Sequence, residues 1–124
     1  MIAAKELRIG NYILLETGID LPRWHCVKAK DIFDIQEGKV TLNAINPIKL
    51  TPKILEKCGF ENKHAEYCEH YKKDKILIEI IPDGTYQARL EYNSSHSLWL
   101  IELASLHQLQ NLYLDLIGEE IEIK

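Results

Sequence analysis

Short apolar stretches alternate with polar residues along the first third of the chain, which predicts a series of short strands. Leu7–Leu15 is rich in strand-forming residues, and Gly10-Asn11 interrupts it, so we expect a first strand with a bend or bulge. A loop with turn residues follows at Thr17–Pro22. Trp24–Ile35 then predicts one long bent strand or two short ones, and Lys39–Ile45 predicts another. Together they indicate a small, twisted N-terminal sheet, for which an SH3-like arrangement is one that fits.

A short helix from Pro52 to Cys58 is predicted by the residues at its two ends. Thr51 is a suitable N-cap, because its hydroxyl can accept an N–H group that the first turn leaves free. Proline is tolerated at the first helical position, where Pro52 stands. Gly59 falls where a helix commonly ends in a left-handed residue, and Phe60 is expected to fold back onto the helix.

The middle of the chain predicts an antiparallel meander. Ala65–Tyr71 has room for a short strand, and Lys75–Ile81 is apolar on almost every position, as expected for the centre of a sheet. Pro82-Asp83-Gly84 is a turn, and the alternation in Tyr86–Tyr92 predicts a strand with one face toward water. Leu98–Leu103 is the next strand of the meander.

The long C-terminal helix has the clearest pattern in the chain. Ser105 and Gln108 match a capping box, and leucine and isoleucine positions from Leu106 to Ile117 cover one helical face. We expect it to end at Gly118 and to pack on the meander. Glu119–Lys124 alternates isoleucine with acids and predicts a short edge strand. The expected fold is therefore α+β, as a single domain over residues 1–124.

Composition and charge narrow the class of protein. The chain has 124 residues, of which 46% are hydrophobic and 27% charged, and these are values of an ordinary globular domain. No apolar run has the ~20 residues of a membrane span, and we expect no signal peptide. The formal net charge of −4 argues against direct nucleic-acid binding. Three cysteines, an odd number, fit a reducing compartment, so we expect a cytoplasmic protein.

Four potential metal ligands follow the short helix, with the spacing C-x5-H-x3-C-x-H. They are Cys58, His64, Cys68 and His70. Zinc accepts these residue types, but structural zinc sites usually contain close pairs such as C-x2-C, which are missing here. Cys58 also lies on the core side of its helix, where a buried thiol is the more common role. We therefore predict no metal site and no cofactor, and keep this cluster as a weak candidate.

The C-terminal helix also carries a polar stripe, because His107, Asn111 and Asp115 are four residues apart. Such a stripe is typical of a solvated face, although it could orient a ligand or supply a base. Gln110 falls inside the apolar arc, so its amide needs a partner. Backbone of a sheet edge or loop is the expected partner, which makes Gln110 a structural clamp; a ligand contact is the alternative.

Two further groups of residues are candidates for a binding role. Arg23-Trp24-His25 places an aromatic ring beside cationic groups, which suits nucleotide stacking, but a tryptophan at the start of a strand is more commonly part of the core. Lys72-Lys73-Asp74-Lys75 is interpreted as a solvated patch that protects a sheet edge. Glycine-rich phosphate loops, nucleophile elbows and zinc-protease motifs are missing from the sequence, so no catalytic residue is predicted.

Three segments together resemble a family of small proteins, without an assigned activity, that recur in prophages and mobile elements of gut-type bacteria. They are Glu6-Leu7-Arg8-Ile9-Gly10-Asn11-Tyr12, then Ile48-Lys49-Leu50-Thr51-Pro52 with Cys58-Gly59-Phe60, then His107-Gln108-Leu109-Gln110-Asn111-Leu112-Tyr113 with Leu116-Ile117-Gly118-Glu119-Glu120-Ile121. The resemblance implies no catalytic residue or cofactor. If the first and last segments meet, they define one candidate binding surface, formed by Arg8, Asn11, His107 and Asn111.

Three functions follow from these observations. The leading one is a non-enzymatic accessory or regulatory module of a phage or mobile element, which binds an unidentified protein partner or forms a homodimer. The alternative is a small-ligand or nucleotide-binding protein that uses Arg23, Trp24 and the helix face. A hydrolase with His107 as base is ranked third.

Overall fold

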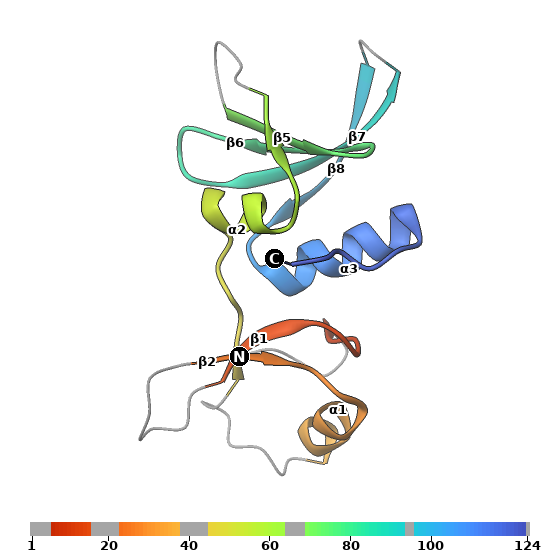
Figure 1. The fold of residues 1–124 in the computed structure, drawn as a ribbon. Helices are drawn as coiled ribbons and strands as arrows, with labels where there is room; N and C mark the ends of the chain where they lie inside the picture. The colour runs from red at the N-terminus through yellow and green to blue at the C-terminus, as the bar shows by residue number, and fades with distance from the viewer. Residues whose placement is uncertain (1–5, 16–22, 38–44, 64–68, 94–95, 124) are drawn as a thin grey trace. The chain divides into compact units, whose positions relative to one another are not determined.

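The computed structural model describes residues 6–15, 23–37, 45–63, 69–93 and 96–123 (Figure 1). The strands are β1 Tyr12–Leu15, β2 Arg23–Cys26, β3 Ile45–Asn46, β4 Glu61–Asn62, β5 Glu69–Lys73, β6 Ile76–Ile80, β7 Tyr86–Asn93 and β8 His96–Leu103. The helices are α1 Ala29–Gln36, α2 Pro52–Lys57 and α3 Leu106–Ile117. Two antiparallel sheets and a C-terminal helix confirm the predicted α+β class.

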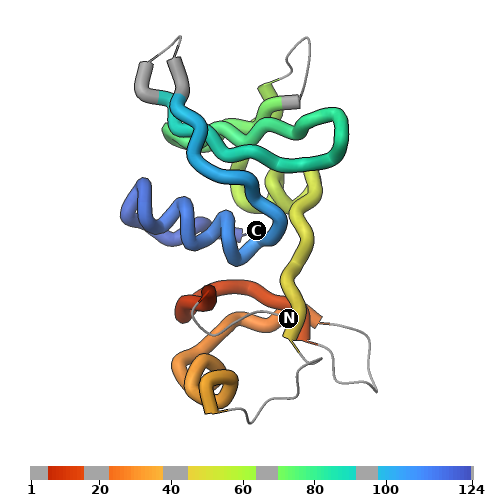
Figure 2. Tube along the Cα trace, turned by 180° about the vertical axis from the view of Figure 1, so that it is seen from behind, coloured from red at the N-terminus to blue at the C-terminus, as the bar shows by residue number. Residues whose placement is uncertain are grey.

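The chain divides into two compact units. The first consists of Met1–Lys49 and Ser105–Leu112, and the second of Leu50–Ala104 and Tyr113–Lys124. Each unit is therefore built from two separate stretches of sequence, and α3 contributes its first part to one unit and its second part to the other. β8 leads directly into α3 (Figure 2). The predicted domain boundaries, 1–124, enclose both units.

In the first unit, β1 lies between its partners in the order β2-β1-β3. A core forms around Leu7, Ile13, Val27 and Ile45, with Leu15, Ile32 and Ile35 packed against it. The predicted first strand is right for Tyr12–Leu15 and wrong for residues 7–11, which form a loop ahead of β1. The chain turns there at Gly10, whose φ of 98° is a conformation that glycine adopts without strain. The Gly10 N–H donates to the Val27 carbonyl at 2.9 Å, which extends the pairing beyond the bend.

The prediction of strand for Trp24–Ile35 is right for its first part and wrong for the rest, because residues from Ala29 onward form α1. Asp31 explains the change, since its carboxylate accepts the Lys28 N–H at 2.8 Å and thereby caps the first turn. Ile32 and Ile35 then reach the core from one helical face. The predicted loop Thr17–Pro22 lies outside the described residues, as does all of the predicted strand Lys39–Ile45 except Ile45.

In the second unit, the described strands form a sheet in the order β4-β5-β6-β7-β8, antiparallel throughout. The central position of β6 confirms the prediction from its apolar sequence. One face of this sheet is buried along a row of residues paired across the strands: Tyr71, Ile78 and Ala88 are 2%, 0% and 0% exposed. The predicted strand Ala65–Tyr71 is described only from its residue 69, within β5.

Helix α2 forms as its end residues predict. The Thr51 hydroxyl accepts the Ile54 N–H at 3.2 Å, and Gly59 has a φ of 91°. The Phe60 N–H donates to the Leu55 carbonyl and the Gly59 N–H to the Glu56 carbonyl, both at 3.0 Å, which is the Schellman pattern at a helix end.

Helix α3 has the bounds that the sequence predicts, Leu106–Ile117, and Gly118 follows it with a φ of 83°. The Ser105 N–H donates to the Gln108 side chain at 3.2 Å, which is one of the two hydrogen bonds of a capping box. The predicted strand Glu119–Lys124 is wrong over its described residues, 119–123, which pair with no strand. Alternation predicts burial, and Ile121 is buried, but a strand also needs an edge to pair with. At 12 residues, α3 is the longest helix in the described part of the chain, and no helix there can span a membrane.

Candidate functional site

The first and last segments of the sequence-predicted surface meet in the first unit. The Asn11 side chain donates to the Asn111 side-chain oxygen at 2.9 Å, although the two residues are 100 positions apart. The Asn11 oxygen accepts the Arg8 N–H at 2.7 Å, and the Asn111 amide donates to the Glu6 carbonyl at 2.8 Å. Asn11 is buried, and Arg8 and Asn111 are half-buried. These contacts hold the N-terminal loop on the first part of α3.

Gln110 acts as the clamp that its position predicts. It is 2% exposed, and its side-chain oxygen accepts the Tyr12 N–H at 2.8 Å. Its amide donates to the Gly10 carbonyl at 3.1 Å. Both partners are loop or strand backbone, as expected, and a side chain with this geometry satisfies a donor and an acceptor at the start of β1.

His107 is enclosed, with 3% of its surface exposed. Its Nδ1 lies 3.1 Å from the Ser105 hydroxyl, whereas its Nε2 is buried and has no hydrogen-bond partner in the described residues. Burial lowers the pKa of the imidazole below its ordinary value, and the nearby Glu6 partly opposes this shift. A neutral ring closed off from solvent gives the hydrolase hypothesis no support, since a general base must reach its substrate.

Trp24 is not a core residue, so that interpretation is wrong. Its side chain is 41% exposed, because β2 is the end strand of its sheet among the described residues. The indole is 5.9 Å from the Tyr12 ring at a tilt of 51°, a common aromatic pair. His25 approaches the Asp31 carboxylate at 2.9 Å, and Arg23 is exposed. Figure 1 shows β2 beside β1, the strand with which it pairs.

The candidate zinc ligands are described only in part, because His64 and Cys68 lie outside the described residues. Cys58 is fully buried, and burial raises the pKa of its thiol to about 11, which opposes the thiolate form that zinc binds. His70 is 3.4 Å from the Glu79 carboxylate. No group of three potential metal ligands occurs within the ranges that the structure describes.

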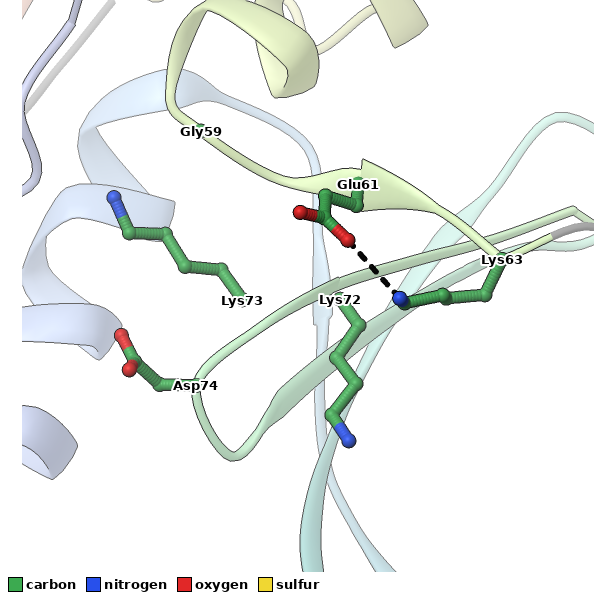
Figure 3. Close-up of a pocket in the computed structure, with 6 residues that line it drawn as sticks. All are labelled: Gly59, Glu61, Lys63, Lys72, Lys73 and Asp74. Carbon is green, nitrogen blue, oxygen red and sulfur yellow. Dashed lines mark hydrogen bonds and ion pairs between the residues drawn. The ribbon is translucent and has the colours of Figure 1, made fainter.

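A cavity of about 270 Å³ lies in the second unit between the end of α2 and the β5–β6 turn (Figure 3). Its lining consists of Gly59, Glu61, Lys63, Lys72, Lys73 and Asp74. The chain run Lys72-Lys73-Asp74-Lys75, interpreted as a solvated patch, thus contributes to a concave surface. Figure 3 shows that Lys72 and Lys73, adjacent in β5, point in opposite directions.

Each lysine of the cavity already contacts an oxygen atom. Lys63 pairs with Glu61 at 3.0 Å, and Lys72 pairs with Glu91 at 2.9 Å. Lys73 donates to the Cys58 carbonyl at 3.0 Å, where a cation complements the negative end of α2.

Lys73 also lies 5.3 Å from the centre of the Tyr113 ring, a cation–π distance. Burial, and then the hydrogen bond that the Tyr113 hydroxyl donates to Asp74, raise the pKa of the phenol to about 12. Ion pairs, a hydrogen bond and a cation–π contact therefore fix the three lysine side chains that line the cavity.

The exposed apolar residues of the second unit are concentrated on β8. Leu98, Trp99 and Ile101 are 57%, 53% and 47% exposed. β8 is the end strand of the described sheet, and β7 is the one described strand that pairs with it. Sequence reasoning identified this strand but not its exposure. The consecutive apolar residues 98–101 do not reveal it, because a strand at the centre of a sheet has the same pattern.

No family model matches the chain, and neither the search of curated proteins nor the search of solved structures gave a match.

Proposed function

We propose that this protein is a small non-enzymatic binding module that docks on a protein partner through β8. The observation that carries the proposal is that no described strand pairs with the outer edge of β8, where the side chains of Leu98, Trp99 and Ile101 are exposed. A partner strand that pairs with this edge satisfies its backbone groups and covers the apolar side chains. Exposed apolar clusters of this kind mark interaction surfaces in proteins.

The sequence of β8 supports this role. Edge strands that must stay unpaired commonly carry lysine, proline or several charges, which discourage pairing. His96–Leu103 contains no lysine and no proline, and Glu102 is its single carboxylate. The chain as a whole is 27% charged, so this low charge is specific to the strand rather than to the protein.

The proposed setting is the cytoplasm, where the cysteines stay reduced, and the proposed context is a phage or mobile element, as the sequence resemblance implies. A protein partner suits the net charge of −4 better than nucleic acid does.

Matched leucine variants test the proposal. Leu98→Lys places a charge on the β8 edge, and Leu116→Lys does the same on α3, where Leu116 is 39% exposed. Wild type and both variants are compared for self-association and for proteins captured from a soluble extract, by quantitative mass spectrometry. Association lost in Leu98→Lys alone supports docking through β8, whereas equal association in all three contradicts it.

Small-ligand binding is a second candidate, and the cavity of Figure 3 is the observation that favours it, because three lysines surround it. The test is the unfolding temperature at millimolar phosphate or nucleotide. A rise that Lys73→Met abolishes would support this candidate, and an unchanged temperature would contradict it.

A further inference from the structure

The turn between β6 and β7 contains the one Asp-Gly pair of the sequence, Asp83-Gly84, and Asn-Gly does not occur in it. In such a pair the backbone nitrogen of the glycine can attack Cγ of the preceding carboxyl, because glycine has no Cβ to hinder the approach. Both residues are exposed to solvent. The sequence therefore makes this turn the place where the attack meets the least hindrance from side chains.

The reaction has two steps and needs no reagent other than water. In the first step the Gly84 nitrogen forms a bond with Cγ of Asp83, the protonated carboxyl loses its hydroxyl, and this hydroxyl leaves as water with the amide proton. In the second step water adds to one of the two carbonyl carbons of the cyclic imide. Addition at Cγ restores aspartate, and addition at the backbone carbon gives isoaspartate, in which the main chain runs through Cγ.

The fold restrains the attacking nitrogen. The Gly84 N–H donates to the Ile81 carbonyl at 2.8 Å, and the Ile81 N–H donates to the Thr85 carbonyl at 2.8 Å. With a φ of 95° at Gly84, these bonds form a three-residue hairpin loop that has glycine in its left-handed position. Attack on Cγ requires the Gly84 nitrogen to turn toward the side chain, and this rotation breaks its hydrogen bond to Ile81.

The fold also holds the carboxyl in its less reactive form. One Asp83 oxygen accepts the Thr85 hydroxyl at 2.6 Å and the Thr85 N–H at 2.9 Å. The bond from the hydroxyl, and then the bond from the N–H, lower the pKa of the carboxyl below its ordinary value. Because the carboxyl must be protonated to lose water, a lower pKa leaves a smaller reactive fraction at neutral pH.

We propose that Asp83-Gly84 is a latent isoaspartate site, which the β6–β7 turn protects while it is folded and which reacts when the turn opens. Thr85 and the Ile81 carbonyl supply the protection. Local opening of a turn costs less free energy than unfolding of the whole domain, so the site is exposed to reaction in a chain that is otherwise folded. Isoaspartate then accumulates in proportion to the time that the turn has spent open.

The product does not fit the folded turn. Isoaspartate adds one carbon to the main chain between residues 83 and 84, and it moves the carboxylate to Cα, away from its two bonds with Thr85. The loop then no longer has the length that joins Ile80 and Tyr86, which pair beside it. Since β6 is the central strand of the described sheet, the modified chain should unfold at a lower urea concentration than the unmodified one.

The first experiment compares the full chain in its folded state with the same chain in concentrated guanidinium chloride, both incubated at neutral pH. Trypsin releases residues 76–89 as one peptide, and electron-transfer fragmentation distinguishes isoaspartate from aspartate at position 83. We expect isoaspartate to form about tenfold or more slowly in the folded chain, because two hydrogen bonds of ordinary strength reduce the open fraction by at least that factor. Asp83→Glu is the blank, since its imide ring would have six members and closes far more slowly.

The second experiment tests Thr85 with two matched variants. Thr85→Val removes the hydroxyl and keeps the branched shape, whereas Thr85→Ser keeps the hydroxyl. In the folded state Thr85→Val should form isoaspartate about fivefold faster than the wild type, which is the factor that one hydrogen bond supplies, and Thr85→Ser should match the wild type. In guanidinium chloride all three chains should react at one rate, because the turn is absent there.

Each part of the proposal has a result that overturns it. An unfolded chain without isoaspartate at position 83 overturns the site, and equal rates in the folded and unfolded wild type overturn protection by the turn. A folded Thr85→Val chain that reacts like the wild type overturns the role of Thr85. Far-UV circular dichroism checks that the variants fold, and Thr85→Ala replaces Thr85→Val if the latter does not. Docking through β8 does not enter these assays and is tested separately by Leu98→Lys.

Discussion

Replacing Gln110 with methionine should cost the protein about 2–3 kcal/mol of unfolding free energy. The change removes two hydrogen bonds, from the Tyr12 N–H at 2.8 Å and to the Gly10 carbonyl at 3.1 Å. Each is worth about 1 kcal/mol net, and the buried groups left without a partner add a further penalty of order 1 kcal/mol, since both belong to half-buried residues.

Methionine is chosen because it isolates this effect. Its volume is close to that of glutamine, so no cavity forms, and the two residues have similar helix propensity. The matched control is Gln36→Met, because Gln36 is an exposed residue at the end of α1. Such a surface change should alter the unfolding free energy by less than about 0.5 kcal/mol.

The measurement is urea unfolding followed by far-UV circular dichroism. With a slope of about 1–3 kcal/mol per molar urea, the expected loss lowers the midpoint by roughly 0.7–3 M for Gln110→Met. If Gln110→Met and Gln36→Met unfolded at the same urea concentration, the amide of Gln110 would not anchor the N-terminal loop, and the clamp would be refuted.

Three further predictions concern single positions. Gly59→Ala and Gly84→Ala should each cost about 1–2 kcal/mol in urea unfolding, because both positions have positive φ, of 91° and 95°. Gly59→Ala should lower the unfolding free energy more than Gly84→Ala, since its added methyl would meet the Lys73 ammonium group at 2.9 Å. Equal losses in the two variants would contradict this. In iodoacetamide labelling of the folded chain, the exposed Cys26 should react well before Cys58, whose thiol pKa is raised to about 11 by burial; equal rates would contradict the burial. Protonation of His107 should lower the unfolding free energy of the protein in acid. Because its folded pKa is below the ordinary 6.5, the unfolded state binds the proton first, so the unfolding free energy falls as pH drops below about 6.5. His107→Gln should weaken that dependence between pH 7 and pH 5, and an unchanged dependence would show that other groups cause it.

Helix ends could be predicted from the sequence because their signals are local. Thr51 and Gly59 mark the two ends of α2 and act on residues within the helix or next to it. The structure confirms Thr51 as the N-cap and Gly59 as the residue with positive φ after the helix. The helix at 29–36 was missed because Ile32, Phe33 and Ile35 fit neither a strand nor a helix period clearly. The decisive residue there is Asp31, which caps the Lys28 N–H.

The candidate sites depended on information that is not local. The need of Gln110 for a partner follows from its helical position, but its partner Tyr12 is 98 residues away and only the fold brings them together. The strand 98–103 was recognised, yet an apolar strand has the same pattern at the centre of a sheet and at its edge. The order of strands decides its exposure, and that order is a property of the whole chain.

The division of the chain has a consequence for synthesis on the ribosome. The first unit requires Ser105–Leu112, and the second requires Tyr113 and the residues after it. Domains commonly fold in the order in which they are made, with the N-terminal one first. Here neither unit has its full set of residues until α3 has been translated. Asn11, for example, is synthesised 100 residues before its hydrogen-bond partner Asn111. Folding of both units should therefore start late, with the apolar strands of the nascent chain present before the helix that completes each unit.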